Sequence, residues 1–163
     1  MFYQKSDTPY IFFDIDGVLN KESDWHVHHF SINDECFNVF KKIIDSLTDI
    51  YKTEPKLITC STWRAGFNNR NENGNTSSLL ETKFKENGLT IDGATPISNK
   101  TRQAEIEYYM RRNNVTSYIV IDDDESLYDR PSEINLYVPD YKKGLVKQDI
   151  NKIIWQLSKT ERK

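Results

Sequence analysis

The chain has 163 residues, of which 37% are hydrophobic, so residues 1–163 are expected to form a single domain with a hydrophobic core. The formal net charge of −3 excludes the strongly basic field of a typical duplex nucleic-acid binder. An aromatic content of 12% argues against disorder, because disordered chains contain few aromatic residues.

Strand-like and helix-like patterns alternate along the chain, which is typical of an α/β protein. Residues 10–14 predict a buried strand, and Ser31 is expected to begin a helix to about residue 49, with Asp34 completing a capping box. The other expected strands lie at residues 56–60, 89–91, 117–122 and 134–138, the other helices at 77–87, 101–113 and 147–158, and polar loops at 20–30, 65–76 and 92–100. We therefore predict a three-layer Rossmann-like fold, with helices on both faces of a parallel sheet of about five strands.

The residues that follow the first expected strand carry the clearest chemical signal. Asp14 and Asp16 are separated by one residue, so their side chains are expected to point to the same side at the end of the strand. Two carboxylates at the mouth of an α/β sheet suit a divalent cation and a carboxylate nucleophile. Taken alone, Asp-x-Asp-Gly also fits a turn or a calcium loop, although the residues after Gly17 lack the later acidic ligands of an EF-hand loop.

Polar residues also follow two other expected strands. The carboxyl ends of parallel strands share one edge of a sheet, so we expect these residues to converge with Asp14 and Asp16. They are Ser61, Thr62 and Arg64 after the second strand, Asp122 and Asp123 after the fourth, and Lys100 and Arg102 at the start of the intervening helix.

Some of these residues also have a structural interpretation. Ser61 and Thr62 have side chains that commonly cap helices. Arg64 either binds a substrate phosphate or pairs with a nearby acid. The histidines in His26–His29 invite a zinc site, but no cysteine or acid at zinc-finger spacing accompanies them, so a surface loop is favoured.

The order of these motifs resembles the haloacid dehalogenase (HAD) superfamily of phosphotransferases. Asp-Ile-Asp-Gly-Val, from Asp14 onward, matches the first motif, and Ser61 or Thr62 matches the second. A Lys or Arg before the fourth strand matches the third motif, and Asp122-Asp123 matches the paired-acid form of the fourth. The resemblance spans nearly the whole chain.

Finer detail is similar to the small HAD domains associated with Swiss Army Knife RNA-repair proteins. The segments that carry this similarity are Asp-Ile-Asp-Gly-Val-Leu-Asn, Ser-Thr-Trp-Arg, Arg-Gln-Ala-Glu-Ile, Val-Ile-Asp-Asp-Asp and Lys-Gly-Leu-Val. The chain departs from that pattern at Gln103, where those domains have Gly, and at Val146, where they have Thr. Both departures lie outside the expected chemistry.

The resemblance implies a catalytic role for the matched residues. Asp14 would attack phosphorus and form an aspartyl-phosphate, while Asp16 would protonate the leaving oxygen and later take a proton from water. Ser61 would hydrogen-bond a phosphoryl oxygen. Arg102 or Lys100 would neutralise negative charge, and Arg102 matches the subfamily better.

The resemblance also implies Mg²⁺ as cofactor, because an oxygen-rich site suits it better than zinc. The implied metal ligands are Asp14, Asp16 through its backbone carbonyl, and Asp123, supported by Asp122. The expected substrate contacts are Thr62, Arg64 and Trp25, the last because HAD enzymes carry a flap after the first motif.

The spacing between the motifs leaves no room for a folded cap domain. Capless HAD members tend to act on large substrates, which favours a terminal phosphate on a nucleic acid, with RNA- or DNA-repair proteins as partners. The alternatives are a nucleotide or small-metabolite phosphatase, and a non-catalytic binding module on the same fold.

Neither the cysteines nor the apolar segments point to a secreted or membrane protein. Cys36 and Cys60 form no disulfide framework and are expected to be reduced and buried. No stretch reaches transmembrane length, and the first residues lack the apolar core of a signal peptide. We expect a cytoplasmic protein with no membrane partner.

Overall fold

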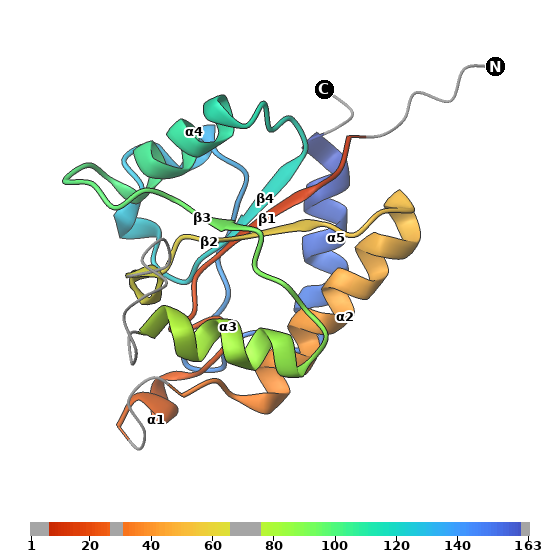
Figure 1. Ribbon diagram of the computed structural model, residues 1–163, viewed down its shortest axis with the longest axis vertical. Coiled ribbons are helices and arrows are strands. Elements are labelled where there is room, and N and C mark those ends of the chain that lie inside the picture. The colour runs from red at the N-terminus through yellow and green to blue at the C-terminus, as the bar shows by residue number, and fades with distance from the viewer. Residues whose placement is uncertain (1–6, 27–30, 66–75, 161–163) are drawn as a thin grey trace.

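A parallel sheet of five strands forms the centre of the computed structural model, which describes residues 7–26, 31–65 and 76–160 (Figure 1). The strands are β1 (Tyr10–Phe13), β2 (Lys56–Thr59), β3 (Gly93–Ala94), β4 (Tyr118–Ile121) and β5 (Leu136–Tyr137). Their order is β3-β2-β1-β4-β5, and every neighbouring pair is parallel. The carboxyl ends of all five strands therefore meet at one edge.

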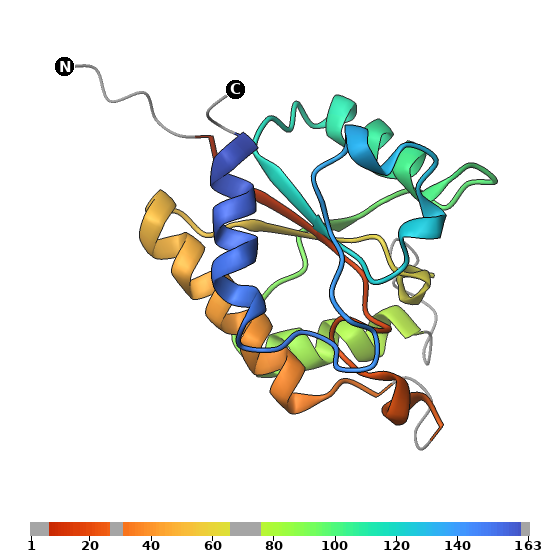
Figure 2. The same ribbon diagram turned by 180° about the vertical axis from the view of Figure 1, so that it is seen from behind.

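Helices cover both faces of this sheet, as Figures 1 and 2 show. The helices are α1 (Glu22–Trp25), α2 (Asp34–Tyr51), α3 (Thr76–Glu86), α4 (Arg102–Arg112) and α5 (Asp149–Thr160). One core cluster joins Ile11 and Phe13 of β1 to α2, α3 and α5, and a second joins Phe12 to Ile106 of α4. The predicted α/β fold is confirmed, and the described segments hold no inserted cap domain.

The central strand β1 is apolar throughout because both of its faces are covered. Ile11, Phe12 and Phe13 are each 0% exposed, although alternate side chains point to opposite faces. A strand buried on two sides reads as a continuous apolar run, which is why the sequence predicts it well.

The helix α2 begins at Asp34, three residues later than predicted. Asn33 is its N-cap: its side chain accepts hydrogen bonds from the backbone amides of Glu35 and Cys36. The predicted capping box of Ser31 and Asp34 is therefore wrong, because Asn33 satisfies these amides and Ser31 lies before the helix.

Two other expected elements differ from the structure. The third strand forms at Gly93–Ala94, and not at residues 89–91, because the Leu89 amide donates a hydrogen bond back to Phe84 O at the end of α3. The expected loop 20–30 contains the short helix α1. Among the described residues, no helix is long and apolar enough to cross a membrane.

Candidate active site

Three aspartates gather where β1 and β4 end. Phe13 and Ile121 are register partners, so the residues that follow them emerge at the same level of the sheet. As a result Asp14, Asp122 and Asp123 each offer a carboxylate oxygen within 4.8 Å of the others. The structure therefore brings together three of the four aspartates for which the sequence predicts a metal-binding role.

Arg102 is the cation that reaches this acidic cluster. It lies at the first turn of α4, and its Nη1 is 3.3 Å from Asp14 Oδ2 and 2.7 Å from Asp122 Oδ2. Lys100 lies on the exposed turn before the helix. Of the two candidates for the cationic role, only Arg102 is seen in contact with the carboxylates in the described structure.

Asp122 is held rigidly behind the other two carboxylates. It is 0% exposed, and its Oδ2 accepts hydrogen bonds from Arg102 Nη1 and, at 2.7 Å, from the Tyr128 hydroxyl. Its Oδ1 accepts a hydrogen bond of 3.0 Å from the Asp124 amide. With both oxygens engaged by protein donors, Asp122 is suited to orienting Arg102 and supporting a cation site.

Burial and neighbouring acids raise the pKa values of Asp14 and Asp123. Burial, and then the neighbouring Asp122, raise the pKa of Asp14 well above its ordinary range, while Arg102 opposes this shift. Burial and Asp122 also raise the pKa of Asp123 to about 6. A cation bound between the carboxylates would stabilise their charged forms. The all-oxygen donor set fits a hard divalent cation such as Mg²⁺.

Asp16 points to a separate set of donors and is not part of the three-carboxylate cluster. Its Oδ1 accepts a hydrogen bond of 2.9 Å from Asn20 Nδ2, and its Oδ2 accepts one of 3.2 Å from Trp63 Nε1. Each oxygen of this carboxyl group therefore has a fixed partner. Its expected metal contact runs through the backbone carbonyl and stays a prediction.

Asn20 organises the loop that follows β1. Its side chain is 1% exposed, and Oδ1 accepts hydrogen bonds from the Gly17 amide at 3.0 Å and from Trp25 Nε1 at 2.8 Å. Its Nδ2 donates to Asp16 and to the backbone oxygen of Ser31, both at 2.9 Å. One buried amide thus ties the end of β1 to α1 and to the approach to α2.

Gly17 is needed in this loop for two reasons. Its φ of +76° lies in the left-handed region that other residues rarely adopt. In addition, a Cβ atom at this position would lie 2.4 Å from Asp123 Cγ. The missing side chain leaves the space that the Asp123 carboxylate occupies.

The residues after β2 have mainly structural contacts. Ser61 is 0% exposed and caps the 3₁₀ helix Thr62–Arg64, accepting a hydrogen bond of 3.2 Å from the Trp63 amide. Thr62 is exposed. The capping interpretation of Ser61 is therefore correct, and phosphate contacts by Ser61 and Thr62 stay predictions.

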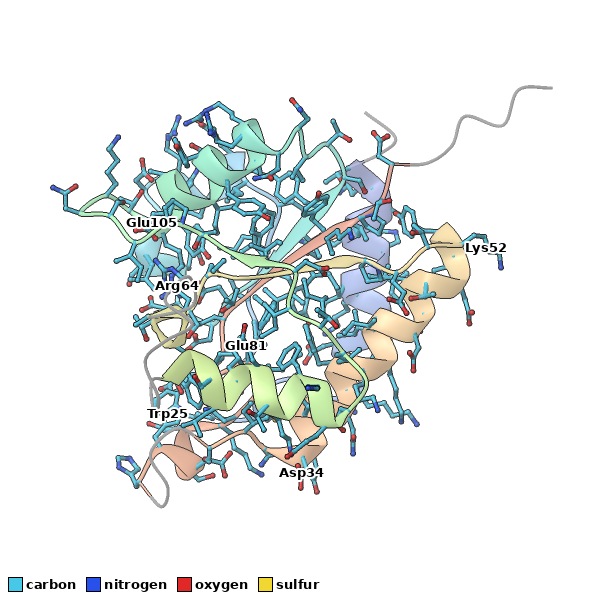
Figure 3. The ribbon with its side chains drawn as sticks, viewed as in Figure 1. Trp25, Asp34, Lys52, Arg64, Glu81 and Glu105 are labelled. Carbon is cyan, nitrogen blue, oxygen red and sulfur yellow. The ribbon has the colours of Figure 1, made fainter. Side chains whose placement is uncertain are left out.

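Arg64 is used within the protein. It is 6% exposed, and its Nη2 pairs with Glu105 Oε2 at 2.7 Å. Nη2 also donates to Pro96 O, while Nε and Nη1 donate to the backbone oxygens of Thr95, Cys60 and Ser61. Figure 3 shows Arg64 and Glu105 close together on the side where β1 and β2 end. Of the two interpretations, the structure shows pairing with an acid, and the expected substrate contact stays a prediction.

Trp25, the third expected substrate contact, lies in α1 on the same side of the molecule (Figure 3). Its indole is half-buried, donates to Asn20 and stacks on Tyr141. Among the histidines considered for zinc, His26 is exposed, whereas His28 and His29 lie outside the described residues.

Residues 10–150 match the family model described as the HAD domain in Swiss Army Knife RNA repair proteins. The chain belongs to this family. The matched range contains all of the strands and the acidic cluster of this HAD domain. The resemblance stated from the sequence is thus confirmed. No curated protein matches the chain.

Sequence reasoning missed several residues that shape the site of this HAD domain. Asn20 ends the quoted segment Asp-Ile-Asp-Gly-Val-Leu-Asn, so its position offered a signal. Trp63 lies in the quoted segment Ser-Thr-Trp-Arg, so its position offered a signal as well. The hydroxyl of Tyr128 gave none, because no quoted segment contains it.

Proposed function

We propose that this HAD domain is a Mg²⁺-dependent phosphomonoester hydrolase in which Asp14 is the nucleophile. The observation that carries the proposal is the position of Asp14, buried at the end of β1 with Arg102 Nη1 3.3 Å from its Oδ2 and two further carboxylates beside it. Membership of the HAD family supports the same chemistry.

In this proposal a carboxylate oxygen of Asp14 attacks phosphorus, and the bond between phosphorus and the ester oxygen breaks. Asp16 donates its proton to that leaving oxygen, which departs as an alcohol. Asp16 then takes a proton from a water molecule that attacks the aspartyl-phosphate, so inorganic phosphate is released and Asp14 is regenerated. Asn20 and Trp63 hold Asp16 in one orientation for both proton transfers.

The side chains of Asp14 and Asp123, with the backbone carbonyl of Asp16, would hold Mg²⁺, supported by Asp122. When bound, the cation would neutralise charge on the phosphoryl oxygens. Arg102 would stabilise the negative charge that it faces at Asp14, and the hydroxyl of Ser61 would donate to a phosphoryl oxygen.

We infer that the substrate is a terminal phosphate on a nucleic acid. Two observations support this inference: the described segments contain no inserted cap that would close the site over a small molecule, and the family is found in RNA repair proteins. Other repair proteins would then be the natural partners. A nucleotide or small-metabolite phosphatase is the second candidate, because the same residues would serve it.

The first experiment measures hydrolysis of p-nitrophenyl phosphate with Mg²⁺ and with a chelator. We expect Mg²⁺-dependent turnover that Asp14→Asn abolishes. The matched control is Asp45→Asn, which changes an exposed aspartate of α2 and should leave activity intact. Activity that survives Asp14→Asn would refute the nucleophile, and a wild type inactive on every phosphomonoester would favour a binding module.

The second experiment identifies the substrate class. Oligonucleotides phosphorylated at the 3′ or the 5′ end are compared with free nucleotides and sugar phosphates by kcat/KM. A preference for oligonucleotides supports a nucleic-acid end, whereas a preference for nucleotides or sugar phosphates supports the second candidate.

A further inference from the structure

Trp25 and Tyr141 form a stacked aromatic pair at the candidate active site. Their ring centroids are 6.1 Å apart and their planes differ by 19°. Tyr141 belongs to the segment after β5, and its backbone oxygen accepts a hydrogen bond of 3.0 Å from the Glu22 amide at the start of α1. Two distant parts of the chain therefore build one aromatic surface.

This surface is accessible and has a cation beside it. Tyr141 is 40% exposed, Trp25 is half-buried, and Lys142 Nζ lies 6.0 Å from the Tyr141 ring centroid. Aromatic rings with an adjacent cation are the combination that binds single-stranded nucleic acids, because bases stack on the rings and the cation attracts the phosphates.

The aromatic pair is connected to the residue that would protonate the leaving group. Trp25 Nε1 donates to Asn20 Oδ1 at 2.8 Å, and Asn20 Nδ2 donates to Asp16 Oδ1 at 2.9 Å. In the proposed reaction the ester oxygen that leaves lies against Asp16. Of the two aromatic side chains linked to Asp16, Trp63 is 3% exposed and Trp25 is half-buried, so Trp25 is the one that an attached nucleoside can reach.

We propose that the Trp25–Tyr141 pair is the stacking platform for the terminal base of a single-stranded nucleic acid that ends in a phosphate. Lys142 contacts the next phosphate of its backbone. The inference rests on the proposed function, and it adds the part of the substrate that is recognised. Stacking of one base on aromatic side chains changes affinity by about 5- to 150-fold.

The test compares two oligonucleotides with the same terminal phosphate, one with its terminal base and one with an abasic terminal nucleotide, at the 3′ and at the 5′ end. For the preferred end, we expect the wild type to show a kcat/KM about 5- to 150-fold higher with the base present. In Tyr141→Ala this ratio should fall toward one, and Tyr141→Phe should restore it.

The control is Trp155→Ala. Trp155 is also an exposed ring with a cation nearby, being 58% exposed and 4.8 Å from Lys159 Nζ, but it lies on the outer face of α5. This variant should keep the wild-type ratio. Loss of the ratio in Trp155→Ala as well would overturn the assignment of recognition to Trp25 and Tyr141.

Failure of the platform is distinguishable from failure of the proposed function. Suppose that the wild type hydrolyses the oligonucleotides but its kcat/KM is the same with and without the terminal base, at both the 3′ and the 5′ end. This result overturns the stacking platform and leaves the proposed hydrolase activity intact, and it is obtained with the wild type alone. If p-nitrophenyl phosphate, free nucleotides, sugar phosphates and all oligonucleotides resist hydrolysis, the hydrolase fails. Fluorescence anisotropy with the base-containing and abasic oligonucleotides then decides the platform: equal affinities overturn it, and tighter binding of the base-containing one supports it.

Discussion

Gly17→Ala is expected to displace the Asp123 carboxylate and weaken Mg²⁺ binding while the fold persists. The new Cβ would lie 2.4 Å from both Cγ and Oδ2 of Asp123. Because the van der Waals contact distance between such non-bonded atoms is about 3.5 Å or more, the carboxylate must move away by roughly 1 Å. We expect the Mg²⁺ concentration for half-maximal activity to rise about 10- to 100-fold, the range found when support of a metal ligand is lost.

The matched control is Gly88→Ala. Gly88 has nearly the same backbone angle, φ +73° against +76°, but an added Cβ there meets no described atom within 4 Å beyond its chain neighbours. Both variants therefore carry the cost of a left-handed alanine, about 1 kcal/mol. Only Gly17→Ala also crowds Asp123.

Two assays distinguish the backbone cost of the alanine from the displacement of Asp123. Thermal unfolding without metal should show a lower melting temperature in both variants. Titration with Mg²⁺, followed by hydrolysis and by the rise in melting temperature, should be altered in Gly17→Ala alone. Identical Mg²⁺ responses in the two variants would refute the reasoning, because Asp123 could then be moved without consequence for the cation.

The other predictions concern buried polar contacts. Asn20→Ala should lower kcat and shift its pH profile, because Asp16 loses a fixed donor; hydrolysis across pH checks this, and an unchanged profile would contradict the positioning role. Arg64→Met should lower the free energy of unfolding by about 3–5 kcal/mol in urea titrations, because Glu105 is left buried without its partner, and a loss below 1 kcal/mol would contradict this. The native pKa of Asp123, about 6, exceeds its ordinary value of about 4. The metal-free native state therefore binds more protons than the unfolded state in this interval, and its melting temperature should fall as pH rises from about 4 to about 6, with a smaller fall in Asp123→Asn; equal slopes would contradict the raised pKa.

Local patterns in the sequence were sufficient for the central strands and for the acidic edge. β1 and β4 are buried on both faces, so each is a run of apolar residues. An acid follows each run directly, Asp14 after β1 and Asp122 after β4. The same reasoning failed for β3, because Gly93–Ala94 contributes little more than backbone pairing with Ile58 and Thr59 and has no apolar run of its own.

Contacts between side chains that are far apart in the sequence could not be predicted from it. The sequence left Arg64 between two interpretations, since nothing local says that Glu105 of α4 comes within 2.7 Å of it. The choice between Lys100 and Arg102 depended on where α4 begins. Because Thr101 is the N-cap, Lys100 lies on the exposed turn before the helix, whereas Arg102 lies in the first turn and its Nη1 reaches Asp14.

The shared amide of Asn20 has a consequence for protein engineering. Any substitution of Trp25 is expected to disturb the orientation of Asp16 as well, because Asn20 hydrogen-bonds both side chains. If the proposed reaction holds, substitutions at Tyr141 should alter selectivity with less effect on Asp16, because Tyr141 stacks on Trp25 whereas Trp25 itself donates the hydrogen bond to Asn20.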